Sequence, residues 1–233
     1  MDVLRDPVSS ASHFSFALAG LVITLFLFRI TSGDRAKRFY GMLFGVCVIL
    51  LYTASGLFHA LNLPREELRF YQKLDMSAIY LMIAGSATAI AGPLLRGWFR
   101  AVILVGQWAF AAIGIAALWF LPKPHHAVMV GLYLGMGWLA TAGVWHYWKA
   151  TGWSGLAWVM AGSAFYTGGA IVELTNWPVL IPGHLASHEI LHFCDMAGTA
   201  CHFVFIVKYA LPYRHPAEGE VVTNLRVCHD HPF

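Results

Sequence analysis

Seven apolar segments, each long enough to cross a lipid bilayer, constrain the fold of this chain more than any other feature. A transmembrane helix needs about 20 mainly apolar residues, and the segments cover residues 13–28, 39–61, 74–95, 98–121, 127–148, 153–174 and 184–211. Only 12% of the 233 residues are charged, against about 25% in a typical soluble domain. Backbone groups find no water in lipid, so segments of this length are helices. The sequence predicts an all-α integral membrane protein with a seven-transmembrane helix bundle.

The loops between these segments are too short to hold another domain. We therefore predict one seven-helix transmembrane domain over residues 1–211 and a polar C-terminal tail over residues 212–233. The tail contains the run Cys228-His229-Asp230-His231, whose spacing closes no four-ligand metal site, so we expect a solvated terminus. Small residues let helix backbones approach closely. Close packing is therefore expected at two glycine pairs within the segments, Gly131 with Gly135 and Gly168 with Gly169.

Lys and Arg residues are divided unevenly between the two ends of the predicted helices. The loops after odd-numbered segments, together with the tail, hold ten of them, whereas the N-terminus and the even-numbered loops hold five. Cytoplasmic loops carry the excess of Lys and Arg. We therefore expect a multi-pass protein of the plasma or inner membrane with a cytoplasmic C-terminus. The net charge of +3 is small and gives no reason to expect a nucleic-acid partner.

Five polar residues from three segments are expected at the same level in the membrane. They are Ser55 and His59 near the end of the second segment, Asp75 at the start of the third, and His188 and His192 at the start of the seventh. Residues four apart share one face of a helix. Because helix direction alternates, these three segment ends meet at one side of the membrane. Ionisable groups inside a membrane are costly and usually functional.

The chemistry of this set indicates a metal site. Three neutral imidazoles and one open position describe a catalytic zinc centre, which makes His59, His188 and His192 the candidate ligands. Zinc is favoured because the set is rich in nitrogen and has no thiolate nearby. Asp75 could act as a general base or orient a histidine, and Ser55 could position the attacking water. The alternative is a polar network that ties three helices together without a metal.

Three motifs resemble those of the hemolysin III proteins, namely Ser55-Gly-Leu-Phe-His59, Leu74-Asp75-Met-Ser-Ala-Ile79 and His188-Glu-Ile-Leu-His192. These proteins belong with the progestin and adipoQ receptors and, more distantly, with the alkaline ceramidases. The family places Ser-x-x-x-His, Asp and His-x-x-x-His on its second, third and seventh helices, and all five positions match. The resemblance implies zinc held by the three histidines, with Asp75 and Ser55 around the metal-bound water. Met76 stands where a His often follows the Asp.

Two classes of function fit these features, and both make a membrane lipid the partner, as substrate or as ligand. The first is a zinc-dependent intramembrane hydrolase of a lipid amide, with a ceramide-like substrate and attack by zinc-bound water. The second is a receptor or sensor of the hemolysin III or adipoQ type with a structural zinc site. A retinal-based pump would need a lysine near the middle of the last helix, and Lys208 lies at its end. The sequence indicates no particular oligomeric state.

Further polar residues lie near the histidine pair. Asp195, Thr199 and His202 continue its helix face at spacings of three and four, which predicts hydrogen bonds between helices or, alternatively, a polar path along the seventh segment. Glu173 and Glu189 are expected either to orient the ligands or to lie at the membrane interface.

Overall fold

The computed structural model describes residues 4–122, 125–181 and 185–216, and most of this part of the chain is helical. Seven α-helices and one π-helical turn follow one another without an intervening strand in the described residues. They are α1 (Pro7–Ile30), α2 (Arg35–Ala60), α3 (Arg65–Leu94), α4 (Gly97–Phe120), α5 (His126–Thr141), α6 (Val144–Thr175), α7 (Ser187–Phe205) and η1 (Ile206–Ala210).

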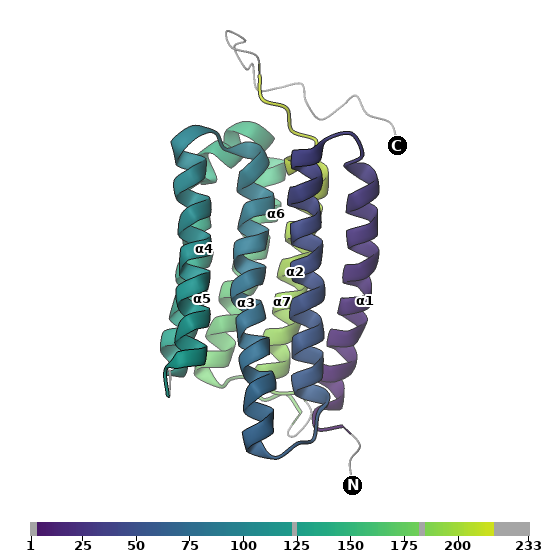
Figure 1. Ribbon diagram of the computed structural model, residues 1–233, viewed down its shortest axis with the longest axis vertical. Coiled ribbons are helices and arrows are strands. Elements are labelled where there is room, and N and C mark those ends of the chain that lie inside the picture. Colours follow the sequence, from purple (N-terminus) through teal and green to yellow (C-terminus); the bar gives the residue numbers. More distant parts are fainter. Residues whose placement is uncertain (1–3, 123–124, 182–184, 217–233) are drawn as a thin grey trace.

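The helices run side by side as a bundle, each antiparallel to the one before it (Figure 1). Within the described residues, six of them are long and apolar enough to cross a membrane: α1 to α4, α6, and α7 continued through η1. This confirms the prediction of an all-α, multi-pass integral membrane protein. The exception is α5, whose 16 residues rise about 24 Å at 1.5 Å per residue, less than the roughly 30 Å of a hydrocarbon core.

The predicted bounds of the fifth segment, 127–148, are wrong. The helix ends at Thr141, the chain turns, and α6 begins at Val144. The ring of Tyr147 covers this turn, since a Cβ added to Gly143 would lie 2.5 Å from its Cζ. A second break follows at Gly152, whose φ of 66° is open to glycine but strained for other residues. The first break lies in apolar sequence, so hydropathy alone did not reveal it, whereas the second lies in the interval 149–152 between the fifth and sixth predicted segments.

The most buried helix is α3, which lies between its neighbours and carries Asp75 near its start (Figure 1). Its glycines let α2 approach, because a Cβ on Gly85 would lie 2.6 Å from the sulfur of Cys47 and one on Gly92 would meet the ring of Tyr40 at 2.5 Å. Substituting either glycine would therefore require the side chain of Cys47 or Tyr40 to shift at the contact with α2, the helix that carries Ser55 and His59.

Of the four glycines at which close helix packing was predicted, one packs closely and three do not. Gly169 packs against α7 as predicted, because an added Cβ would lie 2.9 Å from the Cβ of Cys194. By contrast, a Cβ on Gly131, Gly135 or Gly168 would meet nothing within 4 Å. The prediction of close packing at these three glycines is therefore wrong within this chain.

The first helix begins earlier than the predicted residue 13. Its N-terminus is Pro7, a residue favoured at the first helical position because it lacks an N–H. The preceding backbone is fixed to the end of α2, where the N–H of Asp6 donates to the carbonyl oxygen of His59 at 3.0 Å. The start of α1 therefore lies beside the end of α2 and brings Asp6 to the histidines.

Candidate metal centre

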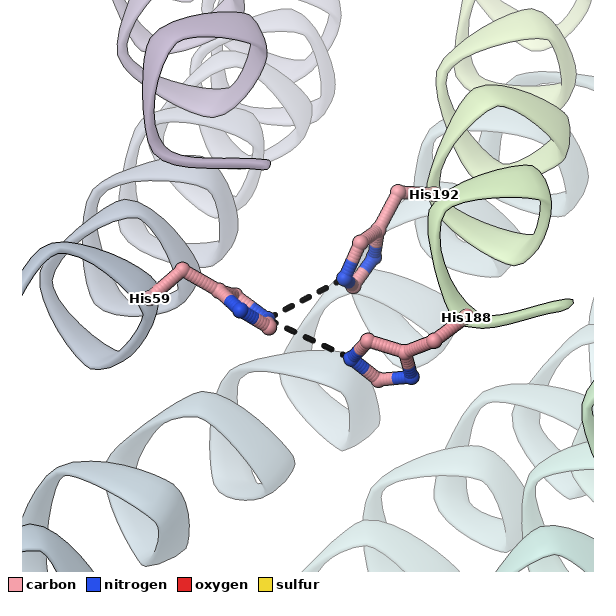
Figure 2. Close-up of side chains that lie close together, drawn as sticks. All are labelled: His59, His188 and His192. Atoms are coloured by element: carbon pink, nitrogen blue, oxygen red, sulfur yellow. Dashed lines mark hydrogen bonds between the residues drawn. The ribbon is translucent and has the colours of Figure 1, made fainter. Parts of the chain in front are cut away.

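Three histidines from two helices converge near one end of the bundle (Figure 2). His59 is the penultimate residue of α2, while His188 and His192 lie one turn apart at the start of α7. The Nε2 atom of His59 is 3.1 Å from Nε2 of His192 and 3.4 Å from Nε2 of His188. One ligand atom from each residue lies within 4.8 Å of the others, so the three side chains could hold one metal ion.

Carboxylates hold the outward nitrogens of two of these imidazoles. Oδ2 of Asp6 lies 3.0 Å from Nδ1 of His59, and Oε2 of Glu173 lies 3.2 Å from Nδ1 of His188. An ionised carboxylate can only accept, so each Nδ1 carries the proton and donates it. Both Nε2 atoms then present lone pairs to the centre, where two acceptors cannot hydrogen-bond each other. A cation between them satisfies both, which is the usual arrangement of histidine ligands backed by carboxylates.

The spacing of the nitrogen atoms also suits an ion. A tetrahedral ion with metal–nitrogen distances of about 2.05 Å separates its ligand nitrogens by roughly 3.3 Å. The two Nε2 separations in the structure, 3.1 and 3.4 Å, bracket that value. His59 and His192 are almost fully buried, so water competes weakly for their nitrogens. The residues present therefore fit a metal that prefers nitrogen ligands.

Asp6 was not among the residues predicted from sequence. It precedes Pro7 as a helix-capping residue would, yet its side chain makes no cap and instead bonds His59 and the guanidinium of Arg5 at 2.9 Å. Burial alone would raise the pKa of Asp6, but the hydrogen bonds from His59 and Arg5 outweigh it, so the pKa lies below its ordinary value. The Asp-Pro pair that starts the helix was the available signal.

His13 was also missed. It lies on α1, is 3% exposed, and its ring stands edge-on to that of His192 with 4.3 Å between centroids. Neither of its nitrogens has a hydrogen-bond partner in the part of the chain that the structure describes. The signal was a histidine within an apolar segment, which by itself indicates a functional position.

A cavity of about 310 Å³ opens from the histidines into the bundle. His188 and His192 line it together with Ser55 and Asp75, whose hydroxyl and carboxyl lie side by side on α2 and α3. Both Ser55 and Asp75 are buried. The structure thus brings the three candidate ligands together and places the other two predicted residues on the wall of the adjoining cavity.

The other polar residues singled out from the sequence near the histidine pair make different contacts from one another. Thr199 accepts or donates hydrogen bonds of 2.9 Å with both Tyr52 of α2 and Tyr166 of α6, which confirms hydrogen bonding between helices at this position. Glu189 accepts from the backbone N–H of Ala186 and so caps α7. Asp195 and His202 line the cavity deeper in the bundle. The run Cys228-His229-Asp230-His231 lies outside the described residues.

Fold and site together define a multi-pass helical membrane protein with a three-histidine centre at the mouth of an internal cavity. The family described as Haemolysin-III related matches residues 1–203. The chain is similar to a protein named Hemolysin-3 from Bacillus cereus, 32% identical over 169 residues that cover 72% of this chain and 74% of that one. A Hemolysin-3 homolog from Bacillus subtilis (strain 168) is 29% identical over 191 residues, covering 82% and 86%. The chain belongs to the haemolysin-III related family.

Proposed function

We propose that this protein is a zinc-dependent intramembrane hydrolase of a lipid amide, with a ceramide-like substrate. The supporting observation is the cavity of about 310 Å³ that begins at the histidines and continues between apolar side chains such as Leu51, Ile79 and Met82. Its volume lies at the lower end of the range for ligand pockets. A lipid chain fits such a space when its polar group lies at the histidine end.

The reaction assigns a role to each residue of the centre. His59, His188 and His192 would hold the zinc ion, which would supply Lewis acidity to the hydrolysis. Asp75 takes the proton from the attacking water and delivers it to the nitrogen of the amide as the carbon–nitrogen bond breaks. Ser55, beside Asp75, holds that carboxylate in place. Asp6 and Glu173 keep two of the imidazoles in the tautomer that ligates through Nε2.

The same proposal includes the topology. The helix α1 begins at one end of the bundle and α7 ends at the other, which requires an odd number of crossings (Figure 1). We assign the seventh crossing to α5, with the polypeptide 144–151 completing its passage. The ten-to-five division of Lys and Arg then places the C-terminus in the cytoplasm and the histidines near the outer surface. A reporter fused to the C-terminus is expected to be active on the cytoplasmic side, and activity only outside would reverse the assignment.

A receptor or sensor with structural zinc is the second candidate. It is favoured by the way the histidines link α2 to α7, since an ion bound there would hold the two helices together whether or not turnover occurs. In that case Asp75 would serve only to pack and orient its neighbours.

Replacing Asp75 separates the two candidates. In a hydrolase, Asp75→Asn keeps zinc and the fold but lowers the rate by about 10²–10⁴, the usual cost of losing a general base. Ser55→Ala is expected to lose less, because it removes one hydrogen bond and no proton carrier. The measurement is single-turnover release of fatty acid from ceramide-like lipids at matched zinc content. Wild-type-like rates in Asp75→Asn, or no release by wild type, would favour the receptor.

A further inference from the structure

Asp195 is a carboxyl group inside the bundle for which the described part of the chain supplies no hydrogen-bond donor. It lies on α7, three residues beyond His192, and its side chain forms part of the cavity wall. In the described segments, no group donates a hydrogen bond to it. The neighbouring Thr199 is already bonded to Tyr52 and Tyr166. An ionisable group at such a depth is costly and normally has a partner.

Apart from histidines, the charged side chains of the cavity wall in the described residues are all carboxyls. Besides Asp195, the wall contains the carboxyls of Asp75 and Glu173, and it includes no Lys or Arg among the described residues. Glu173 is bonded to His188 and Asp75 adjoins Ser55, so Asp195 is the carboxyl left over. A ligand that brings a positive charge would meet a complementary group here, whereas a second carboxylate would be repelled.

A metal ion is not the partner that the geometry favours. In the part of the chain that the structure describes, the converging histidines form a group of potential metal ligands to which Asp195 does not belong. The rest of the wall is largely apolar, which suits a hydrocarbon chain better than a hydrated ion. From His192 to His202 the cavity follows ten residues of α7, or about 15 Å at 1.5 Å per residue. The occupant is therefore long and narrow.

We propose that Asp195 binds the ammonium group of a long-chain amine whose hydrocarbon chain lies along the cavity. The choice of an amine rests on the proposed function, because hydrolysis of a lipid amide adds water across the carbon–nitrogen bond and releases a fatty acid and an amine. A primary alkylamine, like the side chain of lysine, is protonated at neutral pH. Its pairing with Asp195 would satisfy the buried carboxylate and retain the amine in the cavity.

Binding of three probes of equal chain length tests this proposal. Dodecylamine, dodecanol and dodecanoate are titrated into the full-length, zinc-loaded protein in lipid nanodiscs, with empty nanodiscs as the blank. Wild type is expected to bind the amine at least about tenfold more tightly than the alcohol, as a buried charge-assisted hydrogen bond implies. Asp195→Asn is expected to lose this preference and to keep the affinity for the alcohol, while Asp195→Glu restores part of it.

Asp34→Asn is the matched control, because Asp34 caps α2 at the opposite end of the helix from His59 and lies outside the cavity. A wild-type protein that binds the amine no better than the alcohol overturns the proposal without any variant. An unchanged preference in Asp195→Asn overturns it as well, as does a loss of dodecanoate affinity in Asp195→Asn that equals the loss of amine affinity. Preferential amine binding without fatty-acid release would refute the hydrolase but leave this inference standing. Fatty-acid release without a preference for the amine would support the hydrolase and refute this inference.

Discussion

At the histidine end of the cavity, carboxylates bond the outward nitrogens of His59 and His188, whereas Asp195, further along α7, has no such partner among the described residues. Both regions are buried and polar, so burial alone does not explain the difference. Where the chain supplies the hydrogen bonds itself, it fixes side chains in one orientation, which is what an ion requires. Where it leaves a group open toward a cavity, the missing contact is available to a ligand.

The largest loss of zinc affinity is expected from removing a ligand at the histidine end of the cavity. His192→Ala deletes one of three nitrogens and leaves the other two with water in its place, so zinc affinity should fall by well over 100-fold. His146→Ala is the control, since this exposed histidine packs on Phe99 outside the site. Zinc per chain after dialysis against a chelator of known affinity is the readout. Equal zinc content in the two variants would remove the metal centre from the proposal.

A smaller loss of zinc affinity is expected when the carboxylate that bonds a ligand histidine is changed instead of the histidine itself. Asp6→Asn exchanges a charged acceptor for a neutral amide at Nδ1 of His59, and losing such a partner typically costs 10- to 100-fold in metal affinity. Asp34→Asn provides a matched control, because Asp34 also precedes a helix, and its carboxylate accepts from the backbone N–H of Lys37 far from the histidines. Competition with a fluorescent zinc indicator measures the zinc affinity of both variants. Identical affinities would show that Asp6 does not support His59.

Around Thr199, deeper in the bundle, a substitution is expected to change the free energy of unfolding and to leave metal binding unchanged. Thr199→Val removes two hydrogen bonds that join α2, α6 and α7. Such bonds average about 0.6 kcal/mol each within membranes, so the loss should be about 1 kcal/mol. Thr175→Val is the control, because the Thr175 hydroxyl donates to backbone carbonyls at the end of its own helix and just beyond it, and joins no second helix among the described residues. Unfolding in mild detergent reports the difference, and a fall in zinc content in Thr199→Val would contradict the separation of the two regions.

The sequence predicted the helices well where length and hydropathy decide them, and less well where single glycines do. The break before Val144 lies in an apolar stretch and depends on backbone geometry that composition does not express, whereas the bend at Gly152 falls in the interval 149–152 between two predicted segments. The meeting of His59 with the pair on α7 followed from the alternation of helix direction, which is a property of topology alone. The hydrogen bond from His59 to Asp6 could not be predicted from topology. Asp6 directly precedes α1, and the sequence predicted the start of this helix at residue 13 instead of Pro7.

Asp195 shows a different limit of sequence reasoning. Its position on the face of the histidine pair was evident, and hydrogen bonding between helices was the natural expectation. Thr199, one turn later, does bond two other helices. Whether a polar residue finds such a partner depends on side chains from distant segments, and these were known only once α2 and α6 had been placed beside α7.

The separation of the histidines along the chain has a consequence for how the protein is made. His59 and His188 are 129 residues apart, and the second of them opens the last helix. A ribosome therefore inserts six helices into the membrane before the second and third candidate ligands, His188 and His192, exist. In the proposed metal centre, loading would then be a late event in biogenesis, and a chain arrested before residue 187 would reach the membrane with His59 and Asp6 in place but no means of retaining the ion.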